Sequence, residues 1–270
     1  MGHFSVEIYA PPGSNLSGNQ QVDTYEVGAK TNWGGAVPGN FNIAGYYNNF
    51  TNQQLLLGVS DNLPNAPGIN TMAGTASVVN AGKSRLYGFE ADLSIRPFQG
   101  FRLSASYAYL NTKLQKFVAP TLPAGSPYDT VTSPAVGGPI PNSQPHKVNV
   151  SAQYTLPLPE SVGEVSVGAT YIYTASYRAV NDQCPKLPTT GCLVAAPGAG
   201  ILPSTNVVNL NVNWNRVAGL PVDASFFVTN LTKEVVYLTA NDSLGNRGFL
   251  SSLLGEPRMY GFRLRYRFGN

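Results

Sequence analysis

The sequence predicts an all-β protein: an antiparallel, up-and-down transmembrane β-barrel portion of about ten strands, with short periplasmic turns and long external loops. Three observations predict this fold. Apolar and polar residues alternate with a period of two in one segment after another, as they do along a β-strand. Short and long connections alternate along the chain, and aromatic residues gather near the expected strand ends. Membrane-spanning β-barrels combine these three properties.

The segment 260–268 is the clearest strand in the chain. Aromatic or aliphatic residues occupy its even positions, whereas Arg263, Arg265 and Arg267 occupy odd positions. An arginine that faces lipid at the middle of a bilayer costs about 2–4 kcal/mol. Three arginines on one face therefore favour a water-filled lumen on that side. The aromatic face is then expected to contact lipid.

The other expected strands are justified by the same pattern. In 89–96, Phe, Ala, Leu and Ile oppose Glu, Asp, Ser and Arg, and the segments 101–109, 148–156 and 208–215 alternate as cleanly. The remaining segments have a strand-like composition, and no helical periodicity interrupts them. In chain order, the ten expected strands are 4–9, 20–32, 40–57, 83–97, 101–117, 146–156, 165–178, 206–215, 222–231 and 258–268.

The connections between these strands fall into two alternating classes. Four are short and contain Pro or Gly, namely 34–39, 97–100, 157–163 and 216–221. Four are long, namely 58–82, 118–145, 179–204 and 232–257. Loops of about 25 residues are unusual in a compact soluble domain, whereas outer-membrane barrels have short periplasmic turns and long external loops. By this parity the first strand ascends from the periplasm and the last strand returns to it.

Composition excludes several other classes of protein. Charged residues make up 11% of the 270 residues, against about 25% in soluble proteins. No apolar run approaches the roughly 18 residues of a membrane helix. The net charge of +3 is too small to indicate a nucleic-acid partner. The first residues do not form a secretory signal, so either the chain is a fragment whose signal lies upstream or the barrel hypothesis is wrong.

Cys184 and Cys192 lie in a Pro- and Gly-containing segment of the third long loop. Their spacing suits a small disulfide-closed loop in an oxidising compartment. Two free thiols that lie close in sequence are the alternative. A metal site is not expected, because no histidine or further cysteine lies nearby in the sequence.

Charged residues on the expected polar faces are the candidate site residues. A cationic lumen attracts anions, and the arginines of 260–268 are candidates for contacting an anionic solute. The alternative is that they pair with carboxylates of neighbouring strands and hold the wall together. No motif indicates a catalytic set, a cofactor or a metal, and His3 and His146 are isolated. The residues expected to face the lumen are Glu90, Asp92, Arg96, Arg263, Arg265 and Arg267.

Several stretches resemble the C-terminal part of the β-barrel of TonB-dependent outer-membrane receptors, in the order of that family. They include Val22–Lys30, Phe41–Tyr47, Ser84–Pro97 and Phe101–Tyr109. Further stretches follow in the second half of the chain: Pro145–Val150, Val228–Leu231 and Glu256–Gly261. Two features depart from the family pattern. The turn Asn-Leu-Thr-Lys-Glu at 230–234 has its charges reversed, and two residues follow Phe268.

The resemblance implies a barrel of about 22 strands that is closed by an N-terminal plug, in the outer membrane of a Gram-negative bacterium. Such receptors import a scarce solute, such as an iron-siderophore complex, with energy passed on by TonB. TonB would act only through a plug domain, which is missing from residues 1–270. The whole chain is therefore expected to be one C-terminal barrel portion, and it is not expected to be an enzyme.

Two rival hypotheses stay open from the sequence. One is a self-contained ten-stranded outer-membrane barrel that acts as a small pore or adhesin. The other is a soluble β-sandwich that binds carbohydrate, in which the apolar faces would meet in a dry core. Tyr128, Tyr237 and Phe249 in the long loops are candidates for contacting a solute, but no residue there identifies one.

Overall fold

The computed structural model describes residues 3–9, 20–60, 75–118, 130–131, 134, 136–179, 186–187, 191–192, 200–243 and 249–268. Strands dominate this part of the chain, and the single helical element within it is the 3₁₀ turn η1 (Val217–Gly219). The described residues hold no helix that is long and apolar enough to cross a membrane.

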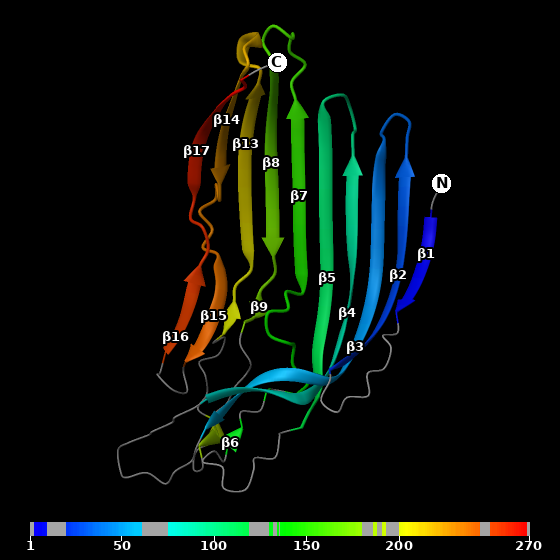
Figure 1. Cartoon of the computed structure of the whole chain (residues 1–270), viewed down its shortest axis with the longest axis vertical. Helices are drawn as coiled ribbons and strands as arrows, with labels where there is room; N and C mark the ends of the chain where they lie inside the picture. The colour runs from blue at the N-terminus through cyan, green and yellow to red at the C-terminus, as the bar shows by residue number, and fades with distance from the viewer. Residues whose placement is uncertain are drawn as a thin grey trace.

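Ten strands form one antiparallel sheet in which each pairs with its neighbours along the path of the chain (Figure 1). All ten match strands expected from the sequence, so the predicted fold class is confirmed. In order they are β1 (His3–Tyr9), β2 (Gln21–Trp33), β3 (Gly39–Ser60), β4 (Thr75–Ile95), β5 (Phe101–Phe117), β7 (His146–Thr155), β8 (Glu164–Thr174), β13 (Thr205–Asn215), β14 (Val222–Thr229) and β17 (Met259–Tyr266). The short β6 (Thr130–Val131) also pairs with β3.

Small hairpins lie within the connections that were expected to be loops. They are formed by β10 (Lys186–Leu187) with β11 (Gly191–Cys192), and by β15 (Tyr237–Ser243) with β16 (Phe249–Leu254). The expected seventh strand 165–178 is too long, since β8 ends at Thr174 and Tyr177–Arg178 form a separate strand, β9, which pairs with β12 (Ile201–Leu202). The expected start of the fourth strand at 83 was also wrong, since β4 begins at Thr75. Bulges at Lys83/Ser84 and between Phe50 and Gln53 shift the alternation there, and this shift hides the continuing strand from a period-two pattern.

The short turns all lie at one end of the sheet, shown at the top of Figure 1. Gly100 and Gly163 in two of these turns have φ values of 81° and 90°, which favour glycine. β1 runs away from this end, because His3 pairs with Lys30 near the end of β2. β17 runs toward it, since Tyr266 pairs with Val222. Both edge strands therefore have the direction that the loop pattern predicts.

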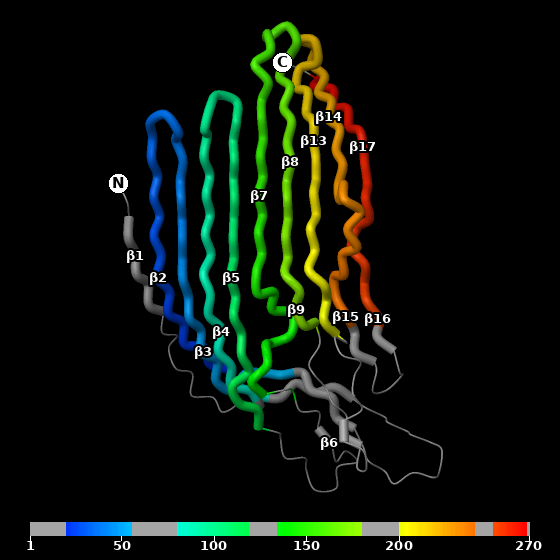
Figure 2. Tube along the Cα trace, turned by 180° about the vertical axis from the view of Figure 1, so that it is seen from behind, coloured from blue at the N-terminus to red at the C-terminus, as the bar shows by residue number. Residues whose placement is uncertain are grey.

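One face of the sheet is apolar and uncovered. Its aromatic side chains are exposed, for example Tyr25 at 55%, Phe226 at 45% and Phe262 at 64%. Within the described residues the ten main strands form a single layer, as the view from behind also shows (Figure 2). A soluble sandwich would require a dry core between apolar faces, and the exposed side chains of this face form no such core among the described residues. A contiguous exposed apolar face of this kind is expected to contact lipid.

The two edges of the sheet, β1 and β17, do not pair with each other in the described part of the chain. They lie at opposite margins of the layer (Figure 1). A self-contained ten-stranded barrel would require that pairing.

Gly88 leaves room for the large side chain of Tyr46 on the neighbouring strand. A Cβ atom at Gly88 would approach the backbone carbonyl of Tyr109 too closely and would lie 2.9 Å from the Tyr46 hydroxyl. By contrast, a Cβ at Gly45 would meet only the Gly88 carbonyl oxygen, at 3.8 Å. The two glycines lie near each other on adjacent strands and form a matched pair for substitution.

We expect Gly88→Ala to lower the free energy of unfolding by about 1–3 kcal/mol, because backbone atoms have to move. Gly45→Ala is expected to be neutral or to stabilise the fold by up to about 1 kcal/mol, through the entropy of the unfolded chain. Urea unfolding of both variants in detergent, followed by tryptophan fluorescence, measures the difference. Equal midpoints for the two variants would contradict this account of Gly88.

Candidate functional site: the polar face of the sheet

The face opposite the apolar one carries mostly uncharged polar side chains, and we call it the polar face. One cross-strand row illustrates it, in which Asn42, Asp92, Ser106 and Asn149 stand side by side on β3, β4, β5 and β7. In a neighbouring row the hydroxyls of Ser151 and Thr170 are 3.2 Å apart. Such a surface is wettable without carrying a high charge density.

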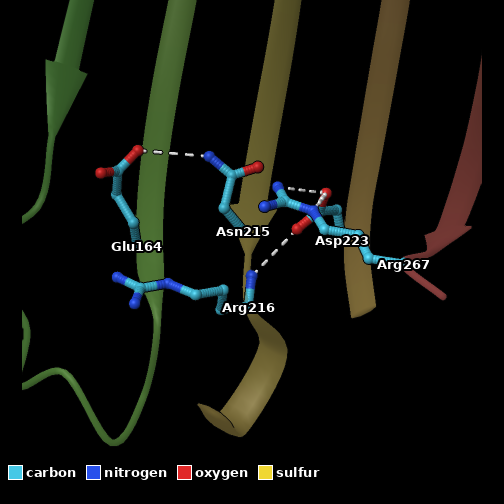
Figure 3. Close-up of polar contacts among 5 residues, drawn as sticks. All are labelled: Glu164, Asn215, Arg216, Asp223 and Arg267. Atoms are coloured by element: carbon cyan, nitrogen blue, oxygen red, sulfur yellow. Dashed lines mark hydrogen bonds and ion pairs between the residues drawn. The ribbon is translucent and has the colours of Figure 1, made fainter. Parts of the chain in front are cut away.

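A polar network secures the polar face where the short turns begin (Figure 3). Asp223 on β14 accepts hydrogen bonds from the Nε and Nη2 atoms of Arg267, at 2.9 and 2.7 Å. It also accepts one from the backbone N–H of Arg216, at 3.1 Å. Arg216 has a φ of 52° at the start of the turn, so Asp223 satisfies a backbone donor that the strand no longer pairs.

Two neighbouring turns interlock beside this network. The Asn215 side chain donates to Glu164 at 3.2 Å, and the Trp214 indole N–H donates to the Val162 carbonyl at 2.8 Å. The Ala218 N–H reaches the same carbonyl at 3.1 Å. The turns 156–163 and 216–221 therefore form one hydrogen-bonded unit at the end of the wall.

The structure places the three candidate arginines of β17 beside β14. Arg265 stands opposite Asp223 in the register, and Arg263 stands opposite Ser225. Arg267 forms the ion pair with Asp223, in which the arginine side chain is 54% exposed and the aspartate 14%. Asp223 was not among the residues predicted from the sequence, although a carboxylate two residues after a turn is well placed to accept a backbone N–H of that turn.

The candidates on β4 belong to a different part of the wall. Asp92 stands between Asn42 and Ser106, and Glu90 stands between Ala44 and Ala108. Six strand-to-strand steps separate β4 from β17, each of about 4.8 Å. The six candidate residues therefore do not form one site, and their exposure to a lumen stays a prediction.

Arg96 lines a hollow of about 600 Å³ near the short turns. Arg102, Gln153 and Thr155 line the same hollow, together with residues of the turns 34–38 and 96–100. Neither arginine forms an ion pair within the described residues. The hollow is thus a polar, cationic concavity. Sequence reasoning missed Arg102 as a site residue, although it has the same parity as Ser104 and Ser106 on β5.

Asn230 forms the centre of a bend between β14 and β15. Its side chain is buried, donates to the carbonyls of Glu234 and Glu256 at 2.8 and 3.3 Å, and accepts from the Glu234 N–H at 2.7 Å. Its own N–H donates to Asn209 at 2.9 Å. Asn230 and Lys233 both have positive φ, at 50° and 59°. One buried amide therefore holds the bend together.

The remaining predicted features are only partly within the described residues. Cys184 lies outside them and Cys192 ends β11, so the disulfide stays a prediction. Tyr128 also lies outside, whereas Tyr237 begins β15 and Phe249 begins β16. No cluster of His, Cys, Asp and Glu that could hold a metal ion occurs among the residues that the structure describes.

An up-and-down antiparallel sheet with one exposed apolar face and one polar face is the wall of a membrane-type β-barrel. That is the class of protein that the fold defines. The chain belongs to the TonB-dependent receptor-like β-barrel family, whose family model matches residues 5–268. The comparison with curated proteins finds no matching relative.

Solved structures share the fold at low sequence identity. The ferric yersiniabactin uptake receptor FyuA from Yersinia pestis is 12% identical with a TM-score of 0.64, over 99% of this chain and 34% of that one. The siderophore receptor PiuA from Acinetobacter baumannii is 18% identical with a TM-score of 0.60, over 91% and 28%. The copper transporter OprC is 16% identical with a TM-score of 0.58, over 92% and 31%. The chain spans about a third of the length of these proteins.

The bend at Asn230 gives a testable prediction. We expect Asn230→Gly, which keeps the positive φ accessible, to lower the free energy of unfolding by about 2–4 kcal/mol, because it leaves several buried backbone groups unpaired. Lys233→Gly is the control, since Lys233 is exposed and glycine also suits its φ. Urea unfolding in detergent compares the two. A Lys233→Gly loss as large as that of Asn230→Gly would show that backbone entropy, rather than the amide, governs the bend.

The Asp223 network gives a second prediction. Asp223→Ala is expected to lower the free energy of unfolding more than Arg267→Ala does, because it removes the acceptor of a backbone N–H as well as an ion pair. Arg267→Ala removes only a largely exposed partner, whose ion pair contributes little. Unfolding at low and high salt checks this ranking. The ranking is wrong if Arg267→Ala proves the more destabilising change.

Proposed function

We propose that the chain is the C-terminal part of the barrel wall of an outer-membrane receptor that imports a scarce solute, such as an iron-siderophore complex, with energy from TonB. The observation that carries this proposal is the family match over residues 5–268 on an open sheet with one exposed apolar face. The functions of similar solved structures, siderophore uptake and copper transport, support the solute class.

In this proposal residues 1–270 form a single barrel portion. The apolar face lies against outer-membrane lipid, and the long loops lie outside the cell. The polar face lines the lumen, where Glu90, Asp92 and the arginines meet water. Contact with TonB would run through a plug domain, which in this family is a separate segment. A catalytic role and a nucleic-acid partner are not part of the proposal.

The hollow around Arg96 and Arg102 has the chemistry to hold an anionic group as it crosses the lumen, since guanidinium groups bind carboxylates and phosphates well. In the Asp223–Arg267 pair, in contrast, the two charges compensate each other, and we assign this pair to stabilising the barrel wall. The two arginine groups of the polar face therefore have different proposed roles.

The open edge of β17 determines what else the receptor needs. The Arg267 N–H donates to the Pro221 carbonyl on the β14 side. Successive residues of a strand direct their hydrogen-bonding groups to opposite sides, so the even residues Phe262, Leu264 and Tyr266 direct theirs to the open edge. Unpaired backbone groups in lipid cost several kcal/mol each. The wall therefore requires further strands to pair with these groups.

Leu264→Pro tests this requirement, because proline removes an edge donor, while Leu264→Ala keeps it. The chain is produced with a polypeptide that supplies a plug and the remaining strands of a related receptor, in an iron-starved host without its own siderophore receptors. We expect growth on the ferric siderophore with the unaltered chain and with Leu264→Ala, and a loss of at least tenfold in uptake with Leu264→Pro.

Heat-modifiable migration of the outer-membrane fraction on a detergent gel reports folding in the same cells. A folded, heat-modifiable species from the chain alone, with solute passage that does not need TonB, would contradict the proposal and favour a self-contained barrel. Recovery of the chain in the soluble fraction would exclude both membrane functions.

A further inference from the structure

Tyrosines form a belt on the apolar face toward the long loops. Tyr25, Tyr47 and Tyr87 stand in one cross-strand row on β2, β3 and β4, and Tyr109 lies beside them on β5. The ring centres of Tyr25 and Tyr47 are 6.4 Å apart, and those of Tyr87 and Tyr109 are 6.5 Å apart. We call these four residues the tyrosine belt. Tyrosines gather at the level where lipid tails meet headgroups.

Four cations lie immediately beyond the belt, on the side of the long loops. Arg85 lies on the apolar face of β4, two residues before Tyr87, and is directly opposite Lys113 of β5. Lys83 stands opposite Lys116 across the bulge. The three lysines are exposed. We call these four residues the cationic cluster: Lys83, Arg85, Lys113 and Lys116.

Two like-charged pairs in succession destabilise a sheet unless an anion lies between them. Within the described residues none of the four forms an ion pair with a carboxylate. Asp23 lies in the same row as Arg85, but two strands away, and it accepts a hydrogen bond from Gln21. The sheet itself therefore supplies no counter-charge for the cluster.

Arg85 is oriented by an aromatic ring and still has a hydrogen-bond donor that a ligand can use. Its guanidinium carbon lies 5.2 Å from the centre of the Tyr87 ring, at a distance typical of a cation–π contact. Its Nε atom is buried and has no hydrogen-bond partner in the described part of the chain. A planar, positioned guanidinium beside flexible lysines suits a phosphate, which accepts several charge-assisted hydrogen bonds.

We propose that the cationic cluster binds the phosphate groups of a lipid headgroup in the leaflet on the side of the long loops. This inference rests on the proposed membrane location. The cluster lies on the apolar face, directly beyond the tyrosine belt, where the headgroup of a lipid packed against the belt has to lie. A free phosphate would have no reason to select this face over the arginine-lined hollow of the polar face.

The test uses the chain assembled with the polypeptide that supplies the remaining strands, in neutral-detergent micelles doped either with lipid A that carries two phosphates or with the same lipid after dephosphorylation. The dissociation constant is measured by lipid titration. We expect tighter binding of the phosphorylated lipid, and at least a tenfold rise in its dissociation constant in the double variant Arg85→Gln/Lys113→Gln. The charge-preserving variant Arg85→Lys/Lys113→Arg should stay within about threefold of the unaltered chain.

Lys147→Gln is the matched control, because Lys147 is an exposed lysine on the opposite, polar face, and we expect it to bind as the unaltered chain does. If the Arg85/Lys113 variant fails to fold, Lys83→Gln/Lys116→Gln tests the second pair with the same expectation. Equal affinity for both lipids, equal affinity in all variants, or displacement by inorganic phosphate at matched concentration would overturn the inference. Failure of the proposed function would be seen separately, as absence of the chain from the outer-membrane fraction of cells.

Discussion

The whole wall depends on one requirement, that every backbone N–H and C=O group finds its partner on an adjacent strand, because lipid offers none. Consecutive strands meet it in near-continuous ladders, such as that between β2 and β3, which runs from Gln21–Thr51 to Trp33–Gly39. Once the backbone N–H and C=O groups are paired within the ladders, each side chain can point only to one face of the sheet or to the other. The alternation of apolar and polar residues and the two unlike faces of the sheet follow from this.

At the turns and bends the ladders end, and side chains there supply the hydrogen-bond partners of the backbone groups. Asp223 accepts the N–H of Arg216, and the amide of Asn230 bonds both backbone groups of Glu234 in the bend after β14 and the carbonyl of Glu256 before β17. Both side chains are short, and each serves a turn or bend that contains residues with positive φ, such as Arg216 in the first case and Asn230 itself in the second. In both cases a side chain completes the hydrogen bonding that a reversal of the chain interrupts.

The order and position of the ten main strands were predictable, because a period of two over eight or more residues is a strong signal. The start of β4 at Thr75 was not, since bulges at Lys83/Ser84 and beyond Phe50 change the parity without changing the composition. β15 and β16 were missed for a related reason, because they form a separate hairpin in a segment of mixed composition. The polar faces of β4 and β17 were predictable, whereas the pairing of Arg267 with Asp223 depends on a register that only the fold provides.

The register also determines how the strands are inclined. The row through Lys30, Asn42, Asp92, Ser106, Asn149, Ile172 and Val207 crosses six strand-to-strand steps. Lys30 lies three residues from the end of β2, but Val207 lies eight from the end of β13. With about 3.4 Å per residue and 4.8 Å per step, this stagger corresponds to a slope of roughly 30°. If the short turns all lie at one membrane surface, the strands are tilted by this angle against the barrel axis. Strands added to either edge must then continue the same pitch, which restricts the partners that can complete this wall.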